Sequence, residues 1–159
     1  MRIFSLFSAA MLALMATAAG YQDHALDYRG GAVMGFDQSQ TKHHFSLFKD
    51  GGAIEVTVKD PADTTNRDAI RSHLRHTAVM FADGNFDNPM LVHDTRNVPG
   101  AAVMRSRKDR IRYDYRDVEN GGRVNIVTSD RDTLAAVHAF LRFQIDEHKT
   151  GDSTEVRSK

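Results

Sequence analysis

The order of apolar and polar residues between positions 64 and 85 is that of an amphipathic helix. Its apolar residues recur every three or four positions, which places them on one face of an α-helix. Several N-cap candidates precede this segment, and Asp83-Gly84-Asn85 is typical of a helix end. The pattern therefore predicts a helix that packs one stripe of side chains against a core: Ile70, Leu74, Thr77, Ala78 and Phe81.

Ahead of this helix, the pattern changes to the alternation of a β-hairpin. Residues 44–48 form a strand candidate, and residues 53–58 alternate between apolar and polar side chains as a half-buried strand does. The sequence Lys49-Asp50-Gly51-Gly52 between them is typical of a turn. Residues 41–85 therefore form a strand–strand–helix unit.

The second half of the chain repeats this order of elements. The two halves align without a gap from Gly51 to Asp60 and from Gly121 to Asp130. After a short insertion in the first half, Leu74 falls on Leu141. The expected elements here are strands at 110–115 and 124–128 and a helix from about 129 to 148, after a capping-box-like pair of Ser129 and Asp132.

The repeat determines the expected fold. One hairpin with one helix cannot bury its own apolar face, but two such units can share a single sheet. We therefore expect an α+β fold, a duplicated strand–strand–helix unit that forms an antiparallel sheet of four or more strands with two helices on one face. Repeat one (41–85), a linker (86–107) and repeat two (108–150) form one domain over 41–150. A linker of this length usually has structure of its own, and we expect a further strand at 90–93.

The two ends of the chain differ in composition from the domain. A basic start, a short apolar run and an alanine-rich ending are typical of a secretory signal peptide, which we assign to residues 1–19, with cleavage near Ala18/Ala19. We therefore expect an exported, periplasmic protein. The apolar run is shorter than the roughly 20 residues of a membrane-spanning helix, so no membrane span is expected. Residues 20–40 are interpreted as an N-terminal arm or short strand, and 151–159 as a flexible tail.

Charge and cysteine content limit the partners. The chain has 21 basic and 21 acidic residues, whereas a nucleic-acid or anionic-membrane partner favours a basic excess. It has no cysteine, so its side chains offer a metal only histidine, methionine or carboxylate ligands. We expect no nucleic-acid partner, and a metal ion or a protein remains as the expected partner.

Histidine and methionine gather in and around the first predicted helix. His73, His76 and Met80 lie on one strip beside the apolar stripe, because residues three and four positions apart face the same way. In the aligned second helix, the positions of His73 and His76 hold Phe140 and Phe143. This difference suggests that the first helix has acquired ligand-type side chains.

These residues predict a metal site. His43 and His44 lie next to each other on a strand and point to opposite faces, so at most one of the two can join the helix. Imidazole suits copper and zinc, while a thioether favours reduced copper, so copper is expected before zinc. The candidate ligands are His43, His44, His73, His76, Met80, His93 and Met104.

The function predicted from these residues is periplasmic copper handling or sensing. One alternative is a protein-interaction module that uses its sheet face or an arginine-rich edge, with the histidines serving only as structural residues. A second alternative is an uncharacterised enzyme, although the chain has no Gly-x-Ser-x-Gly elbow, His-Glu-x-x-His helix or phosphate loop.

Several segments resemble a family of small exported bacterial proteins of unestablished activity: residues 34–38, 43–45, 70–74, 138–145 and 148–152. The resemblance covers nearly all of the chain after the signal peptide. Members of this family often carry an automatic label of aspartate carbamoyltransferase. That enzyme has a longer catalytic chain with a Ser-x-Arg-Thr phosphate loop, which this sequence lacks. The resemblance therefore implies kinship with the family but not that reaction.

Overall fold

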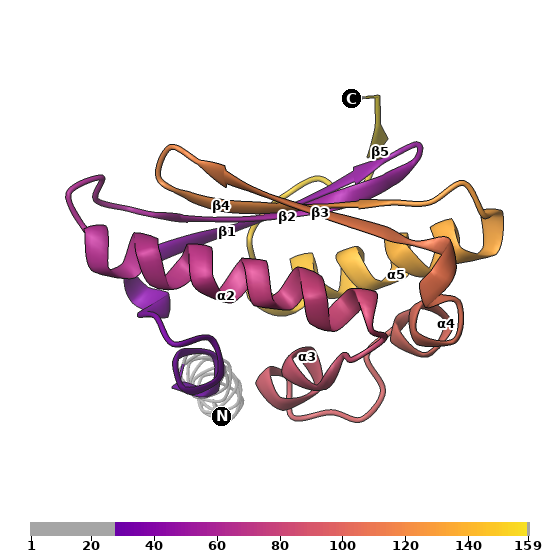
Figure 1. The fold of residues 1–159 in the computed structure, drawn as a ribbon, viewed down its shortest axis with the longest axis horizontal. Helices are drawn as coiled ribbons and strands as arrows, with labels where there is room; N and C mark the ends of the chain where they lie inside the picture. The colour runs from indigo at the N-terminus through magenta and orange to yellow at the C-terminus, as the bar shows by residue number, and fades with distance from the viewer. Residues whose placement is uncertain (1–27, 159) are drawn as a thin grey trace, which may run out of the picture.

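The computed structural model describes residues 28–158, so the expected signal peptide and its cleavage site lie outside the described residues. These residues form one β-sheet with helices on one face (Figure 1). After helical residues 28–34, the elements in chain order are η1 (Gln38–Gln40), β1 (Thr41–Phe48), β2 (Gly51–Val58), α2 (Thr64–Ala82), α3 (Asp87–Val92), α4 (Ala101–Ser106), η2 (Lys108–Arg110), β3 (Arg112–Val118), β4 (Gly121–Val127), α5 (Arg131–His148) and β5 (Val156–Arg157).

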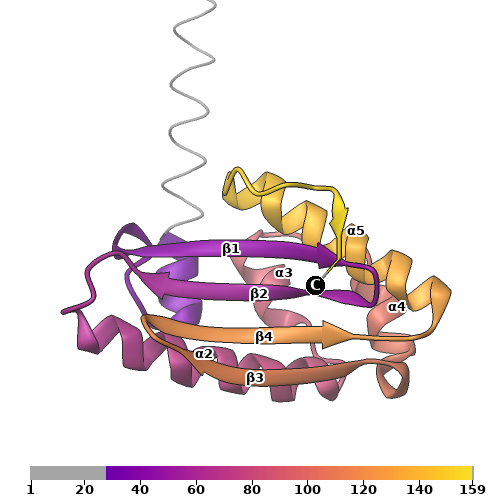
Figure 2. The same cartoon turned by 90° about the horizontal axis from the view of Figure 1, so that it is seen from above.

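The predicted duplicated α+β fold is confirmed. Two strand–strand–helix units, β1-β2-α2 and β3-β4-α5, share a five-stranded sheet in the order β3-β4-β2-β1-β5 (Figure 2). All neighbouring strands are antiparallel except β1 and β5, which are parallel. The second strands of the two repeats, β2 and β4, pair with each other at the centre.

Each helix covers the hairpin of the other repeat. Helix α2 packs on β3 and β4, while α5 packs on β1 and β2 (Figures 1 and 2). The repeated glycines reflect this exchange, because a Cβ on Gly52 would lie 2.2 Å from Cδ1 of Leu141, and one on Gly122 would lie 3.2 Å from Cδ1 of Leu74. Glycine leaves room there for a leucine of the opposite helix.

Helix α2 has the stripe that its sequence predicts. Its buried residues are Ile70, Leu74, Thr77, Ala78 and Phe81. At its start the Asp63 carboxylate accepts a 3.0 Å hydrogen bond from the Asn66 amide, and Gly84 follows its end with φ +78°. None of the helices between residues 28 and 158 is both long and apolar enough to cross a membrane.

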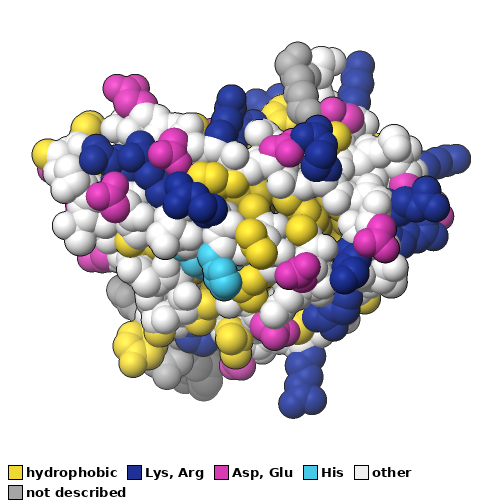
Figure 3. All heavy atoms as spheres, viewed as in Figure 1, with side chains coloured by type: hydrophobic (Ala, Val, Ile, Leu, Met, Phe, Trp, Pro, Cys, Tyr) yellow, Lys and Arg dark blue, Asp and Glu magenta, His cyan; other side chains and the backbone are white. Residues whose placement is uncertain are grey.

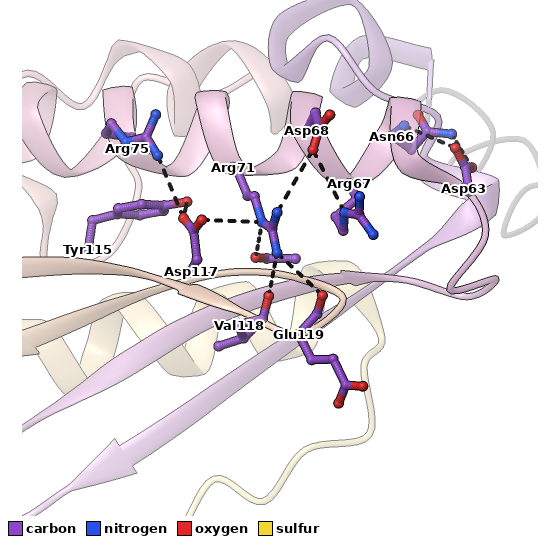
Figure 4. Close-up of polar contacts among 11 residues, drawn as sticks. Asp63, Asn66, Arg67, Asp68, Arg71, Arg75, Tyr115, Asp117, Val118 and Glu119 are labelled. Carbon is purple, nitrogen blue, oxygen red and sulfur yellow. Dashed lines mark hydrogen bonds and ion pairs between the residues drawn. The ribbon is translucent and has the colours of Figure 1, made fainter.

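Arg71 links α2 to the turn between β3 and β4 (Figure 4). Its guanidinium donates to the carbonyl oxygens of Gly121 at 3.0 Å, Val118 at 2.9 Å and Glu119 at 3.3 Å. It also lies 3.6 Å from the Asp117 carboxylate. The side chain therefore joins a helix of the first repeat to the hairpin of the second.

The structure corrects several local predictions. The strand expected at 90–93 is wrong, because helix α3 ends there, and Pro89 is tolerated near its start, where backbone N–H groups have no intrahelical partner. The described part of the expected arm is helical over residues 28–34. Asp130, rather than Ser129, is the N-cap of α5. Within the expected tail, Val156–Arg157 form strand β5, which pairs with β1.

Candidate functional site

A small, mainly apolar pocket lies between the sheet and the helices. Its volume is ≈ 60 Å³. A water molecule needs about 10–15 Å³ of such space, and drug-sized ligands occupy pockets of roughly 300–1,000 Å³. The pocket therefore suits an ion or a few waters better than an organic molecule. Among its lining residues are four histidines and one methionine: His43, His73, His93, His148 and Met34.

The four histidines come from four different parts of the fold. His43 and Phe45 are two positions apart on β1 and both line the pocket, as the alternation of a strand requires. His73 projects from the middle of α2, and His148 is the last residue of α5. His93 is the C-cap of α3 in the linker. The pocket forms only when both repeats and the linker are in place.

Three of the four imidazole rings, those of His43, His93 and His148, are close enough to be ligands of one ion. The ring centroids of His43 and His148 are 5.1 Å apart, and those of His93 and His148 are 5.0 Å apart. Two imidazoles that bind one ion through nitrogens at about 2 Å have centroids on the order of 5 Å apart. The Nε2 atom of His73 lies 3.2 Å from the Thr77 hydroxyl.

Burial keeps the imidazoles neutral. Burial, together with the charges of His73 and His44, lowers the pKa of His43 to about 4. Burial, with the charge of His76, lowers the pKa of His73 to about 4, and burial with the charges of His43 and His93 lowers that of His148 to about 3. Neutral imidazole is the form that binds metals, so these three side chains need lose no proton at pH 7.

One ring nitrogen in the pocket has unused hydrogen-bonding capacity. Nε2 of His43 is buried and has no hydrogen-bond partner among residues 28–158. Nδ1 of His93 is also buried, but it lies 3.6 Å from the Glu147 carboxylate. Nε2 of His93 lies 3.0 Å from the Gln144 side-chain oxygen, which orients the ring, and burial lowers the pKa of His93 despite this bond. A buried nitrogen without a partner is costly, so a ligand that uses it would gain free energy.

The internal repeat shows what is special about this pocket. When the alignment of the halves is continued, His43 corresponds to Tyr113, His73 to Phe140 and His148 to Phe81. These three counterparts also lie together, with Phe81 5.8 Å from both Tyr113 and Phe140 between ring centroids. At each of these three aligned positions, one repeat therefore holds an imidazole and the other a larger aromatic ring, and Phe81 and Phe140 line the same pocket as the histidines.

The other candidate ligands lie elsewhere. His76 is exposed on α2, and Met80 is half-buried, with its sulfur 3.8 Å from the Asn88 amide nitrogen. His44 is exposed and its Nδ1 lies 3.1 Å from the Asp152 carboxylate. Met104 is completely buried in the core. Of the seven predicted residues, the structure brings His43, His73 and His93 to the pocket.

Sequence reasoning missed two pocket residues, Met34 and His148. Helical spacing places His148 on the second helix, far in sequence from the first. Its correspondence to Phe81 in the aligned repeat, together with that of His43 to Tyr113, was the signal available. Met34 comes from helical residues 28–34, where the sequence pattern is weak. His138 has a different role, because its Nε2 bonds to the carbonyl oxygens of Phe48 and Gly51 at 2.9 and 3.0 Å.

The histidines of the pocket do not form a ready-made metal centre. On the face of the molecule shown in Figure 3, hydrophobic side chains lie between charged ones, and histidine is exposed in one small patch. Within the described part of the chain, no group of three or more histidine, cysteine or acidic side chains has its donor atoms already arranged around a metal position. Metal binding at this pocket would therefore require the imidazoles to turn toward one another.

No protein-family model, curated protein or solved structure matches this chain. The kinship suggested by the sequence stays a prediction, and the functional inference depends on the pocket.

Proposed function

We propose that this protein binds a transition-metal ion in the pocket formed by His43, His73 and His148. The observation that carries the proposal is that three pocket residues, His43, His73 and His148, are histidines where the aligned position of the other repeat holds an aromatic ring. A core that needs only packing is better served by apolar rings, since a buried imidazole must leave water. Three such replacements around one pocket favour ligation over packing.

Copper is the metal that we propose, with zinc as the alternative. Imidazole accepts both ions, but the thioether of Met34, which also lines the pocket, favours reduced copper. His93 is the further ligand from the linker, held through its bond to Gln144. Together with the export predicted from residues 1–19, this set supports copper handling or sensing in the periplasm, with the metal ion as the partner.

Metal titration of the purified protein tests the proposal. The protein, freed of metal with EDTA and desalted, would be titrated with Cu(I) under argon against a chromophoric competitor, and separately with Cu(II) and Zn(II). The informative variants, His73→Phe and His148→Phe, give each site the residue of the other repeat, so packing is kept while a ligand is lost. Each should weaken binding at least about 100-fold, since even changes beyond the ligands cost 10- to 100-fold.

His76→Ala is the matched control, because His76 lies on the same helix but is exposed. It should leave the affinity unchanged. Equal binding by wild type and the two phenylalanine variants would disprove the site, as would a stoichiometry that falls only with His76→Ala. If Zn(II) binds more tightly than Cu(I) and its binding is lost in the same variants, the proposed site is supported but its metal is zinc rather than copper.

A further inference from the structure

The face of the sheet opposite the helices has a hollow of its own, separate from the histidine pocket. In Figure 2 this face is seen from above, and no helix among residues 28–158 covers it. The hollow has a volume of ≈ 640 Å³. Its lining comes from β1, β3, β4 and the chain end at β5: Ser46, Phe48, Arg112, Asp114, Arg116, Arg123, Asn125, Val127, Arg157 and Ser158.

The strand register explains why the sheet is hollow here. Paired residues of neighbouring strands share a face, so the outward residues of β2 lie between those of β1 and β4. Two of these β2 residues are Gly51, opposite Phe48 and Val127, and Ala53, opposite Ser46 and Asn125. The small β2 side chains form a floor, and longer side chains on the outer strands form the walls.

Arginine dominates these walls. Four guanidinium groups and one carboxylate, that of Asp114, line the hollow. Arg112 pairs with Asp114, while Arg123 pairs with Glu55 at 2.9 Å and lies over the Phe48 ring, 5.8 Å from its centroid. Arg116 and Arg157 have no carboxylate partner among the described residues, and Arg157 donates to the Ser46 hydroxyl at 3.0 Å.

Two of these arginines are placed side by side at a cost. Arg116 on β3 is the direct cross-strand partner of Arg123 on β4, so both guanidinium groups stand on the same face. Like charges directly opposite each other destabilise a sheet. Glu55 neutralises Arg123 on its other side but leaves Arg116 uncompensated. An anion between the two would remove the repulsion.

We propose that this hollow binds a small anion that carries two or more carboxylate or phosphate groups. Guanidinium groups present paired N–H donors that match the oxygens of both groups. Arg116 and Arg123 hold one end of the ligand from β3 and β4, while Arg157 holds the other end from beyond β1. The Asn125 and Ser46 side chains in the middle row offer uncharged hydrogen bonds.

Isothermal titration of the metal-free protein at low salt tests this site, with citrate and inorganic triphosphate as the probes. Saturable binding should weaken at least about tenfold in Arg116→Ala/Arg157→Ala, because each charge-assisted pair contributes strongly to anion binding. Arg116→Lys/Arg157→Lys should fall between wild type and the alanine variant, since lysine keeps the charge but loses the forked geometry. Arg96→Ala, an exposed arginine outside the hollow, is the control.

Binding of citrate alone, of triphosphate alone or of both supports the site and identifies the group that it prefers. Absence of saturable binding of either probe up to millimolar concentration would overturn the proposal, and so would an equal loss in Arg96→Ala. His148→Phe, which leaves this face unchanged, should bind the anions like wild type. Failure of the metal proposal is thereby distinguished from failure of this one.

Discussion

At the scale of single residues, burial in the tertiary structure, and not spacing in the sequence, determines which histidines line the pocket. His73 and His76 are three positions apart on α2, yet one lines a pocket and the other is exposed. His148, distant in sequence, has its ring 5.1 Å from that of His43. In the pocket, burial lowers the pKa values of His43, His73 and His148 well below the ordinary 6.5.

These shifts predict how the metal-free protein responds to acid. In the unfolded chain the three histidines titrate near 6.5, but in the folded state at about 4, about 4 and about 3. Between these values the unfolded chain binds more protons, so the free energy of unfolding should fall as pH falls from about 6.5 to about 4. Urea unfolding at several pH values, in EDTA, measures it.

His148→Phe removes one of these groups and provides the comparison. Its free energy of unfolding should depend less steeply on pH over the same range, because one fewer buried histidine takes up a proton on unfolding. His76→Ala, at an exposed position of α2, is the matched control for the loss of one imidazole. A wild-type slope of zero between pH 6.5 and 4 would contradict the burial of these imidazoles.

At the scale of elements, the two helices are predicted well by their sequences because their stripes and caps are local. The five core positions of α2 follow from helical spacing alone, and both helices start after an aspartate that caps a backbone amide. What local pattern cannot specify is the hairpin on which each helix lies. That choice depends on contacts such as those of Arg71 with the turn after β3, which join residues far apart in the chain.

Arg71→Ala tests how far this contact holds α2 in place. The substitution leaves three carbonyl oxygens without their guanidinium donor, so it should lower the free energy of unfolding by about 1–3 kcal/mol. Arg75→Ala is the matched control, one turn further along α2. Arg75 is largely exposed and lies 3.6 Å from Asp117, so its loss should cost less than about 1 kcal/mol. Equal losses in urea unfolding would show that the carbonyl contacts contribute nothing specific.

At the scale of the whole molecule, each repeat packs its helix on the hairpin of the other repeat. Because α2 covers β3 and β4 while α5 covers β1 and β2, neither repeat buries its own apolar face. The histidine pocket is therefore lined by both repeats, because His43 and His73 come from one repeat and His148 from the other. A site at such a junction exists only in the complete fold.

The exchange predicts that one repeat will not fold as a monomer. A fragment of residues 41–85 should be largely unfolded at low micromolar concentration by circular dichroism, because α2 lacks the strands that it covers. At high concentration it should gain structure only together with dimerisation in analytical ultracentrifugation, since two copies can restore the exchange. A folded monomeric fragment would disprove the packing dependence.

The sequence by itself determined the α+β fold, the duplication and the buried stripe of α2, because periodicity and caps act over a few residues. It also pointed to His43, His73 and His93 among the candidates. The tertiary structure decided that each helix packs on the hairpin of the other repeat. It also placed two further residues in the pocket, His148 and Met34, and left three candidate ligands outside it: His76, Met80 and Met104. Spacing establishes which side chains share a face of one element, but only long-range packing determines what that face meets.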